Sequence, residues 1–183
     1  MSCSFFIPIG KEKECKIVIM EIRPSTEKDF DRIMEIYAYA RDFMAKNGNP
    51  SQWGPTHWPP KELISRDIAE GTSYVCVHEG RVVGTFFYTE GEEIEPTYGH
   101  IEDGAWQGGN TYGVVHRIAA DGTVKGTGKF CLDWAYRQCG HLRIDTHGDN
   151  LVMQNLLKKL GFVHCGMVHV EEDDAPRLAY EKN

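Results

Sequence analysis

Residues 124 to 129 read Val-Lys-Gly-Thr-Gly-Lys, a glycine-bearing turn that leads into a predicted helix. The first backbone N–H groups of a helix have no partner inside it, and the helix dipole is positive at that end. Glycine lets a phosphate approach the backbone closely, and the lysines add positive charge. The stretch therefore predicts a pyrophosphate site made of Val124, Lys125, Gly126, Thr127, Gly128 and Lys129.

The residues after the turn argue against two common nucleotide-binding loops. Phe130 stands where a phosphate loop of the NTPase type has Ser or Thr, and the Gly122–Gly128 spacing also misses that pattern. Cys131 stands where the dinucleotide motif has its third glycine. For this segment alone, an ordinary glycine-containing helix start remains the alternative.

Periodicity on both sides of the turn predicts strands and helices in mixed order. The expected strands are Met20–Pro24, Tyr74–His78, Arg81–Thr89, Tyr112–Ala120, Leu142–Thr146, Phe162–Val168 and Leu178–Tyr180. The expected helices run from a cap at Ser25 or Thr26 to Asn47, from Pro60 to about Ala69, over Phe130–Cys139 and over Leu151–Leu160. Glu79-Gly80 predicts a tight hairpin turn, and Glu171–Asp174 the tip of a last hairpin. This order fits a three-layer α/β domain on a mixed sheet.

The second half of the chain adds two features to the turn. Asn150 opens the helix after the strand Leu142–Thr146, and that helix ends in Gly161-Phe162. Turn, Asn and Gly-Phe in this order resemble the GCN5-related N-acetyltransferase (GNAT) family, from about Met20 to the C-terminus. The resemblance implies a three-layer α/β/α fold with a mixed, mostly antiparallel sheet and a splayed parallel strand pair that holds coenzyme A.

The family resemblance also implies an activity: direct transfer of an acetyl group from acetyl-CoA to a primary amine of a small-molecule or peptide acceptor. The pantetheine arm is expected between Tyr112–Ala120 and Leu142–Thr146. The edge amides of Ile118, Ala119 and Ala120 are expected to pair with the arm and to polarise the thioester carbonyl. Asn150 and Asn155 are further cofactor-binding candidates, although Asn150 equally suits a helix N-cap.

Two positions depart from the family pattern. Thr123 stands where the family has Arg or Gln, and Leu157 stands where it often has a tyrosine acid. Because leucine cannot protonate a leaving thiolate, the proton must come from another group or from water. Leu157 also motivates the alternative function, a non-catalytic acyl-CoA-binding sensor or interaction module on the same fold.

The candidate general base is His116, an imidazole on a central strand. A hydrogen-bonded core histidine is the alternative interpretation. Weaker candidates are Asp145, His147 and Tyr112, and a covalent acyl-cysteine at Cys139 or Cys165 is disfavoured because neither cysteine has an evident base beside it.

The loop after the first helix is expected to bind the acceptor. It carries Gln52, Trp53, His57 and Trp58, whose aromatic rings suit a pocket wall; the alternative is that the tryptophans fill the core. The carboxylates of Glu90–Asp103 are expected to form a solvated loop. The alternative is that this acidic segment and Trp106 form another wall of the acceptor pocket.

Composition limits which other classes of function and location the protein can have. The chain has 183 residues and a net charge of −7, which argues against a nucleic-acid surface. It has no apolar run of about 18 residues, so no membrane span is expected. Six cysteines without a Cys-x-x-Cys pair favour a reduced, cytoplasmic protein without a metal. We expect an appendage at residues 1–19, with Met20 a candidate natural start, one domain at 20–183, and a homodimer by family analogy.

Overall fold

The computed structural model describes residues 19–170 and 175–183. Within them, a seven-stranded sheet is made of β1 (Met20–Pro24), β2 (Ser73–His78), β3 (Arg81–Glu92), β4 (Thr111–Ala120), β5 (Leu142–His147), β6 (Val163–Val168) and β7 (Arg177–Lys182). The helices are α1 (Phe30–Lys46), α2 (Lys61–Ala69), α3 (Thr127–Cys139) and α4 (Leu151–Lys159), with 3-10 turns η1 (Glu27–Asp29) and η2 (Pro96–Gly99). The predicted appendage (except Ile19) and the predicted hairpin tip at 171–174 lie outside the described residues, so the domain boundary stays a prediction.

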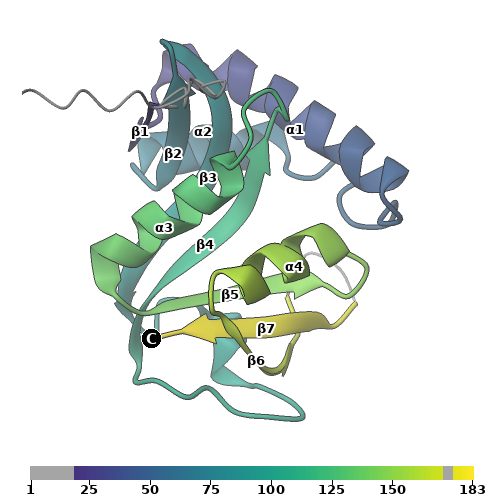
Figure 1. Ribbon diagram of the computed structural model, residues 1–183, viewed down its shortest axis with the longest axis vertical. Coiled ribbons are helices and arrows are strands. Elements are labelled where there is room, and N and C mark those ends of the chain that lie inside the picture. Colours follow the sequence, from purple (N-terminus) through teal and green to yellow (C-terminus); the bar gives the residue numbers. More distant parts are fainter. Residues whose placement is uncertain (1–18, 171–174) are drawn as a thin grey trace, which may run out of the picture.

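The sheet is mixed, with a single parallel contact between neighbouring strands in the described residues. The strand order is β1-β2-β3-β4-β5-β7-β6, and every neighbouring pair is antiparallel except β4 and β5. β4 and β5 pair only at Gly113–Leu142 and Val114–Arg143, and beyond these residues they diverge (Figure 1). The predicted fold, with its splayed parallel pair, is confirmed.

The two faces of the sheet are covered by different helices. Val75 and Val77 on β2 pack with α1 and α2, whereas Cys76 between them packs with α3 and α4. This alternation is what a strand buried on both faces requires. Figure 1 shows α3 lying along β4 on the near side, with α2 behind β2.

Several element ends differ from the sequence prediction, and three of these differences have a clear physical cause. α3 begins at Thr127, so Gly128 and Lys129 lie in its first turn rather than before it, because Gly126 caps the helix with a φ of +88°. The predicted first helix opens as the 3-10 turn η1, where the Asp29 side chain accepts the Thr26 N–H at 2.8 Å. β3 extends to Glu92 because β4, from Ala120 back to Thr111, pairs with the β3 residues from Gly84 to Glu92.

A β-bulge interrupts β4 beside the point of divergence. Thr85 pairs with Ala119 and Phe87 with His116, so Arg117 and Ile118 both face Phe86. Arg117 takes a φ of +52°, which is unusual for a residue with a side chain. A bulge leaves one backbone N–H out of the ladder and redirects the side chains around it.

The carboxylates of Glu90–Asp103 were expected to form a solvated loop, and this is correct only in part. Glu93, Glu102 and Asp103 are exposed, whereas Glu90 and Glu92 belong to β3 and Glu95 is only partly exposed. The segment 93–110 also packs against the sheet. Tyr98 and Trp106 pack into a third apolar cluster with Tyr112 and Val114 of β4. The buried carboxylate of Glu181 accepts the backbone N–H groups of Gln107 and Gly108. The segment is therefore fastened to the sheet, because long-range contacts give its apolar side chains a place to pack.

Candidate active site

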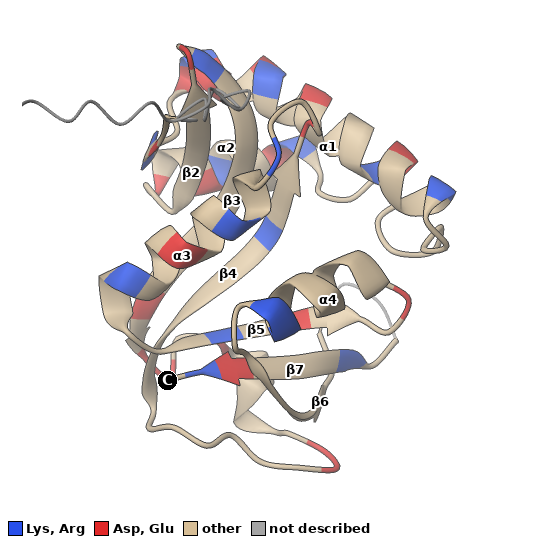
Figure 2. Ribbon diagram, viewed as in Figure 1, with Lys and Arg blue, Asp and Glu red and all other residues tan. Residues whose placement is uncertain are grey.

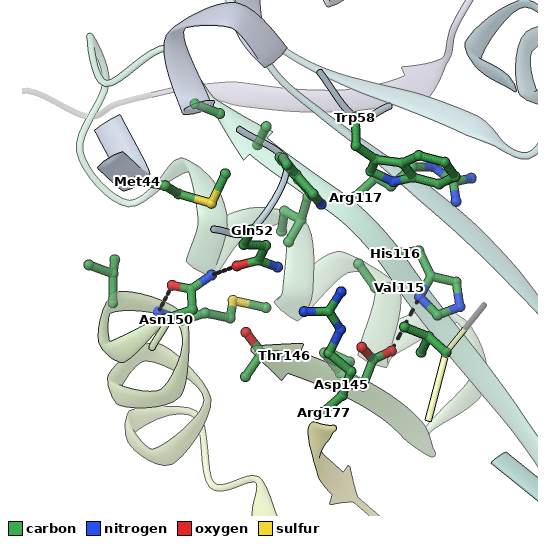
Figure 3. Close-up of a pocket in the computed structure, with 18 of the residues that line it drawn as sticks. Met44, Gln52, Trp58, Val115, His116, Arg117, Asp145, Thr146, Asn150 and Arg177 are labelled. Atoms are coloured by element: carbon green, nitrogen blue, oxygen red, sulfur yellow. Dashed lines mark hydrogen bonds and ion pairs between the residues drawn. The ribbon is translucent and has the colours of Figure 1, made fainter. Parts of the chain in front are cut away.

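A cavity of about 780 Å³ opens where β4 and β5 diverge (Figure 3). Helices, loops and both diverging strands contribute residues to its walls. One wall is formed by α1 and the loop that follows it, another by residues 95–97, and the floor by the second halves of β4 and β5 together with the start of α4. Segments far apart in the sequence thus meet at one site.

Seven residues predicted for the site line this cavity. They are Gln52, Trp53, His116, Ile118, Ala119, Ala120 and Asn150. Trp58 lines it as well, whereas His57 is exposed outside its walls. Asn155 also lies outside the walls, exposed on the outer side of α4.

The predicted phosphate turn adjoins the cavity without lining it. Gly122 lines the cavity just before the turn, and Leu156, another lining residue, is the nearest neighbour of Gly128. A Cβ atom on Gly128 would lie 3.3 Å from the Leu156 side chain, so the glycine allows α3 and α4 to approach closely. The turn and the gap between the strands therefore form one continuous surface.

Local geometry leaves the first N–H groups of α3 available to an anion. The Phe130 N–H donates to the Gly126 carbonyl at 2.9 Å, so those of Thr127, Gly128 and Lys129 precede the first intrahelical bond. The Thr127 hydroxyl donates to the Val124 carbonyl at 2.9 Å, which closes the turn. Basic and acidic residues alternate along the outer side of α3 (Figure 2), and Lys129 pairs with Asp133. Lys125 is exposed at the turn.

Thr123, one of the two residues that depart from the family pattern, has a structural role. Its backbone N–H and its hydroxyl both donate to Asp121, at 3.0 and 2.6 Å. Asp121 is itself buried and pairs with Arg32 and Arg81. The residue thus fixes the path of the chain from β4 into the turn.

Asn150 makes hydrogen bonds both within α4 and across the cavity. Its side-chain oxygen accepts the Met153 N–H at 3.1 Å, which is the N-cap role considered from the sequence. Its side-chain nitrogen donates to Gln52 Oε1 at 3.1 Å (Figure 3). The same Gln52 oxygen also accepts from Asn49. The loop after α1 is thereby tied to the start of α4 across the cavity.

His116 lies between two carboxylates. Its Nε2 is 2.8 Å from Glu95 Oε2, its Nδ1 is 3.6 Å from Asp145 Oδ1, and the Tyr98 hydroxyl donates to that same Asp145 oxygen at 2.7 Å. Burial lowers the pKa of His116, but the hydrogen bond with Glu95 and the charge of Asp145 outweigh burial and raise it above its usual value. Burial likewise opposes ionisation of Glu95, yet His116 and Thr97 lower the pKa of this carboxyl to about 2.

Arg117 lines the same cavity although it follows His116 directly in a strand. Consecutive strand residues normally point to opposite faces. Here the Phe87 ring contacts both, with the Arg117 guanidinium carbon 4.7 Å from its centroid and the His116 ring centroid 5.8 Å away. Arg117 Nη2 donates to the buried Asp67 at 2.7 Å.

The other catalytic candidates lie elsewhere, apart from Asp145. Tyr112 is buried beneath the Arg143 guanidinium, and His147 accepts the Asp149 N–H at the end of β5. Cys139 and Cys165 lie outside the cavity walls, and burial raises the pKa of the Cys165 thiol to about 11. Leu157 is fully buried in the core on the inner side of α4, and a leucine supplies no proton donor.

Within residues 19–170 and 175–183 there is no group of three or more metal-binding side chains.

Sequence reasoning missed two residues of the site, Glu95 and Arg117. Glu95 was counted among solvated carboxylates, and only its hydrogen bond with His116 across 21 positions reveals it. Arg117 was passed over because strand alternation places it opposite His116. A bulge is the feature that overrides alternation, and nothing local in the sequence marks it.

No family model and no curated protein matches the sequence. Solved structures do match. An acetyltransferase of the GNAT family from Streptococcus agalactiae is 31% identical with a TM-score of 0.75, over 89% of this chain and 94% of that one. A PaiA N-acetyltransferase from Thermoplasma acidophilum, in complex with coenzyme A, is 15% identical with a TM-score of 0.63, over 90% and 99%. A ribosomal-protein-alanine N-acetyltransferase from Brucella melitensis is 19% identical with a TM-score of 0.58, over 88% and 98%.

The fold of the chain is that of these acetyltransferase structures, and the 31% identical relative, which matches most of both chains, shows the family. The chain belongs to the GNAT family of acetyltransferases, as the turn, Asn150 and Gly161-Phe162 indicated. In the part of the chain that the structure describes, no helix has the length and apolar character to cross a membrane.

Proposed function

We propose that this protein is an N-acetyltransferase that moves the acetyl group of acetyl-CoA directly to a primary amine. The observation that carries the proposal is the continuity between two features: the gap where β4 and β5 diverge, and the free N–H groups at the start of α3. An extended arm with a pyrophosphate at one end matches that surface in shape and charge.

Each part of the surface has a chemical task in this proposal. The first N–H groups of α3 hold the pyrophosphate, with Lys125 and Lys129 adding positive charge. Backbone groups of Ile118, Ala119 and Ala120 pair with the pantetheine arm, and Asn150 and Asn155 contribute from α4. An N–H group released from the ladder at the β4 bulge polarises the thioester carbonyl and stabilises the oxyanion.

The acceptor enters beside Gln52 and Trp53, and its amine reaches the thioester near His116. The amine nitrogen forms a bond to the carbonyl carbon, the carbon–sulfur bond then breaks, and the thiolate takes a proton. His116 is the stronger base of its pair, since the pKa of Glu95 is about 2, and it accepts the proton of the amine. The thiolate receives its proton from the imidazolium formed in this way or from water.

One observation favours a second function. Residue 157 is a leucine, whereas the family often has a tyrosine acid at this position. Its side chain is buried and does not line the cavity. A non-catalytic sensor that binds acyl-CoA on the same fold is consistent with that feature. The two functions share the cofactor and differ only in turnover.

Thermal unfolding with acetyl-CoA tests the shared premise. A ligand at about 100 times its Kd stabilises a protein by about 2.7 kcal/mol, which corresponds to a rise in Tm of roughly 5–11 °C for a domain of this size. Acetyl-CoA is expected to give a rise of this order, and ATP is not. An unchanged Tm at saturating acetyl-CoA rules out both functions, whereas a rise without thiol release on any amine identifies the sensor.

A further inference from the structure

The cavity has hydrogen-bond donors to spare, and this property points to the acceptor. Its two lining carboxylates are already engaged: Glu95 with His116 and Thr97, and Asp145 with Tyr98 and His116. A second positive charge on the acceptor, as in a polyamine, finds no unengaged carboxylate among the described lining residues. The acceptor therefore has to satisfy donors rather than acceptors.

The surplus donors belong to Arg117 and Trp58. The Arg117 side chain is only 10% exposed, and among the described residues its guanidinium has a single hydrogen-bond partner, Asp67, which takes one Nη2 hydrogen. Its Nε is buried without a partner in the described part of the chain, and so is Nε1 of the Trp58 indole. Buried donors of this kind cost free energy unless a ligand or water satisfies them.

The position of these donors fits a ligand that also presents an amine to His116. Both Arg117 and His116 contact the Phe87 ring. The bulge in β4 lets these two consecutive side chains face the same cavity. A guanidinium thus lies next to the proposed base. Figure 3 shows Trp58 and Arg117 above the His116–Asp145 pair. Phe43 and Met44 give the cavity an apolar part of its wall.

We propose that Arg117, assisted by Trp58, binds a carboxylate of the acceptor, and that the acceptors are free amino acids with an apolar side chain. A carboxylate accepts two hydrogen bonds from the planar guanidinium, and charge-assisted bonds of this kind are among the strong ones. The amine on the neighbouring carbon then lies beside His116 while the side chain contacts the apolar wall. This inference rests on the proposed function and adds the substrate class to it.

Three ligands of one shape test the inference on the unaltered protein: phenylalanine, phenylalaninamide and phenethylamine. Thiol release from acetyl-CoA gives kcat/KM for each. Phenylalanine is expected to exceed the other two by about 10- to 100-fold, the range of one or two charge-assisted hydrogen bonds. Equal rates for all three overturn the inference and leave the proposed function intact. Faster turnover of the amide also overturns it and indicates a peptide N-terminus instead.

Substitutions at two arginines of the cavity wall locate the effect. Arg117→Gln is expected to remove the preference for phenylalanine, and Arg117→Lys to restore it only in part, because Lys lacks the planar fork. Arg66→Gln removes another arginine of the cavity wall and is expected to keep the preference. A preference that survives Arg117→Gln and disappears in Arg66→Gln contradicts the assignment.

Binding measurements keep the two claims separate. Calorimetry with coenzyme A present gives the affinity of each ligand even if no turnover occurs. Tighter binding of phenylalanine than of phenethylamine without any turnover supports the carboxylate site and refutes the transferase proposal. Equal or undetectable binding of both overturns the carboxylate site whatever the rate of transfer.

Discussion

Arg143 is the residue whose loss tests most clearly how the segment 93–110 is held. Its side chain is 5% exposed and lies between two rings, 4.5 Å from the Trp106 centroid and 4.1 Å from that of Tyr112. It donates to Glu181 at 2.9 Å and to the Gly109 carbonyl at 3.0 Å. The substitution Arg143→Met keeps the apolar length and removes the charge and the donors.

The expected cost follows from this burial. Removing one partner of a buried ion pair destabilises a protein by 3–5 kcal/mol, and we expect about 3 kcal/mol because Glu181 keeps other donors. One of these is His141, whose Nε2 lies 2.7 Å from the Glu181 carboxylate. For a domain of this size, about 3 kcal/mol lowers the Tm by roughly 6–12 °C.

Denaturant-induced unfolding, followed by tryptophan fluorescence, measures the loss. Lys129→Ala is the control, because it breaks the more exposed Lys129–Asp133 pair on α3 and is expected to cost about 0.5 kcal/mol or less. The reasoning is refuted if Arg143→Met costs no more than this control.

Three further substitutions probe the site itself. Gly126→Val is expected to weaken acetyl-CoA binding at least about 10-fold in calorimetry, because the φ of +88° at the start of α3 suits only glycine. The control is Gly140→Val, which has a φ of +70° at the other end of the same helix and should leave the affinity for acetyl-CoA unchanged. Glu95→Gln removes a group that raises the pKa of His116, so the rising limb of kcat/KM against pH should move to lower pH, and an unmoved limb excludes His116 as the base. Trp53→Ala is expected to raise KM for the acceptor several-fold with no change in the Kd of acetyl-CoA, and an equal loss in both argues that Trp53 only supports the fold.

Features with a local cause were predictable from the sequence. Gly126 and Gly161 take positive φ values at the two helix boundaries where the sequence placed a turn and a helix end. Glu79 and Gly80 both take positive φ values, as a two-residue hairpin turn requires. Asn150 caps α4, because its side-chain oxygen accepts one of the first N–H groups of the helix, which have no partner inside it.

Features that depend on distant residues were not predictable. Glu95 and His116 meet because distant residues fasten the segment 93–110 to the sheet. One of them is Glu181, which lies more than 70 positions beyond Gln107 and Gly108. The orientation of Arg117 depends on a bulge that forms when two strands pair with unequal numbers of residues. The acceptor recognition proposed for Arg117 depends on this second group of features, and for that reason the sequence pointed to a cofactor more readily than to an acceptor.

The most direct test of the central claim is a joint measurement on one sample: CoA thiol released from acetyl-CoA, and N-acetylated product determined by mass spectrometry. With phenylalanine as acceptor, the account predicts equal molar amounts of thiol and of N-acetyl product, both growing with enzyme concentration. Thiol release with no acetylated amine contradicts direct transfer. No release above the rate without enzyme, over a panel of amines and amino acids that includes phenylalanine, contradicts the proposal that this member of the GNAT family is an active acetyltransferase.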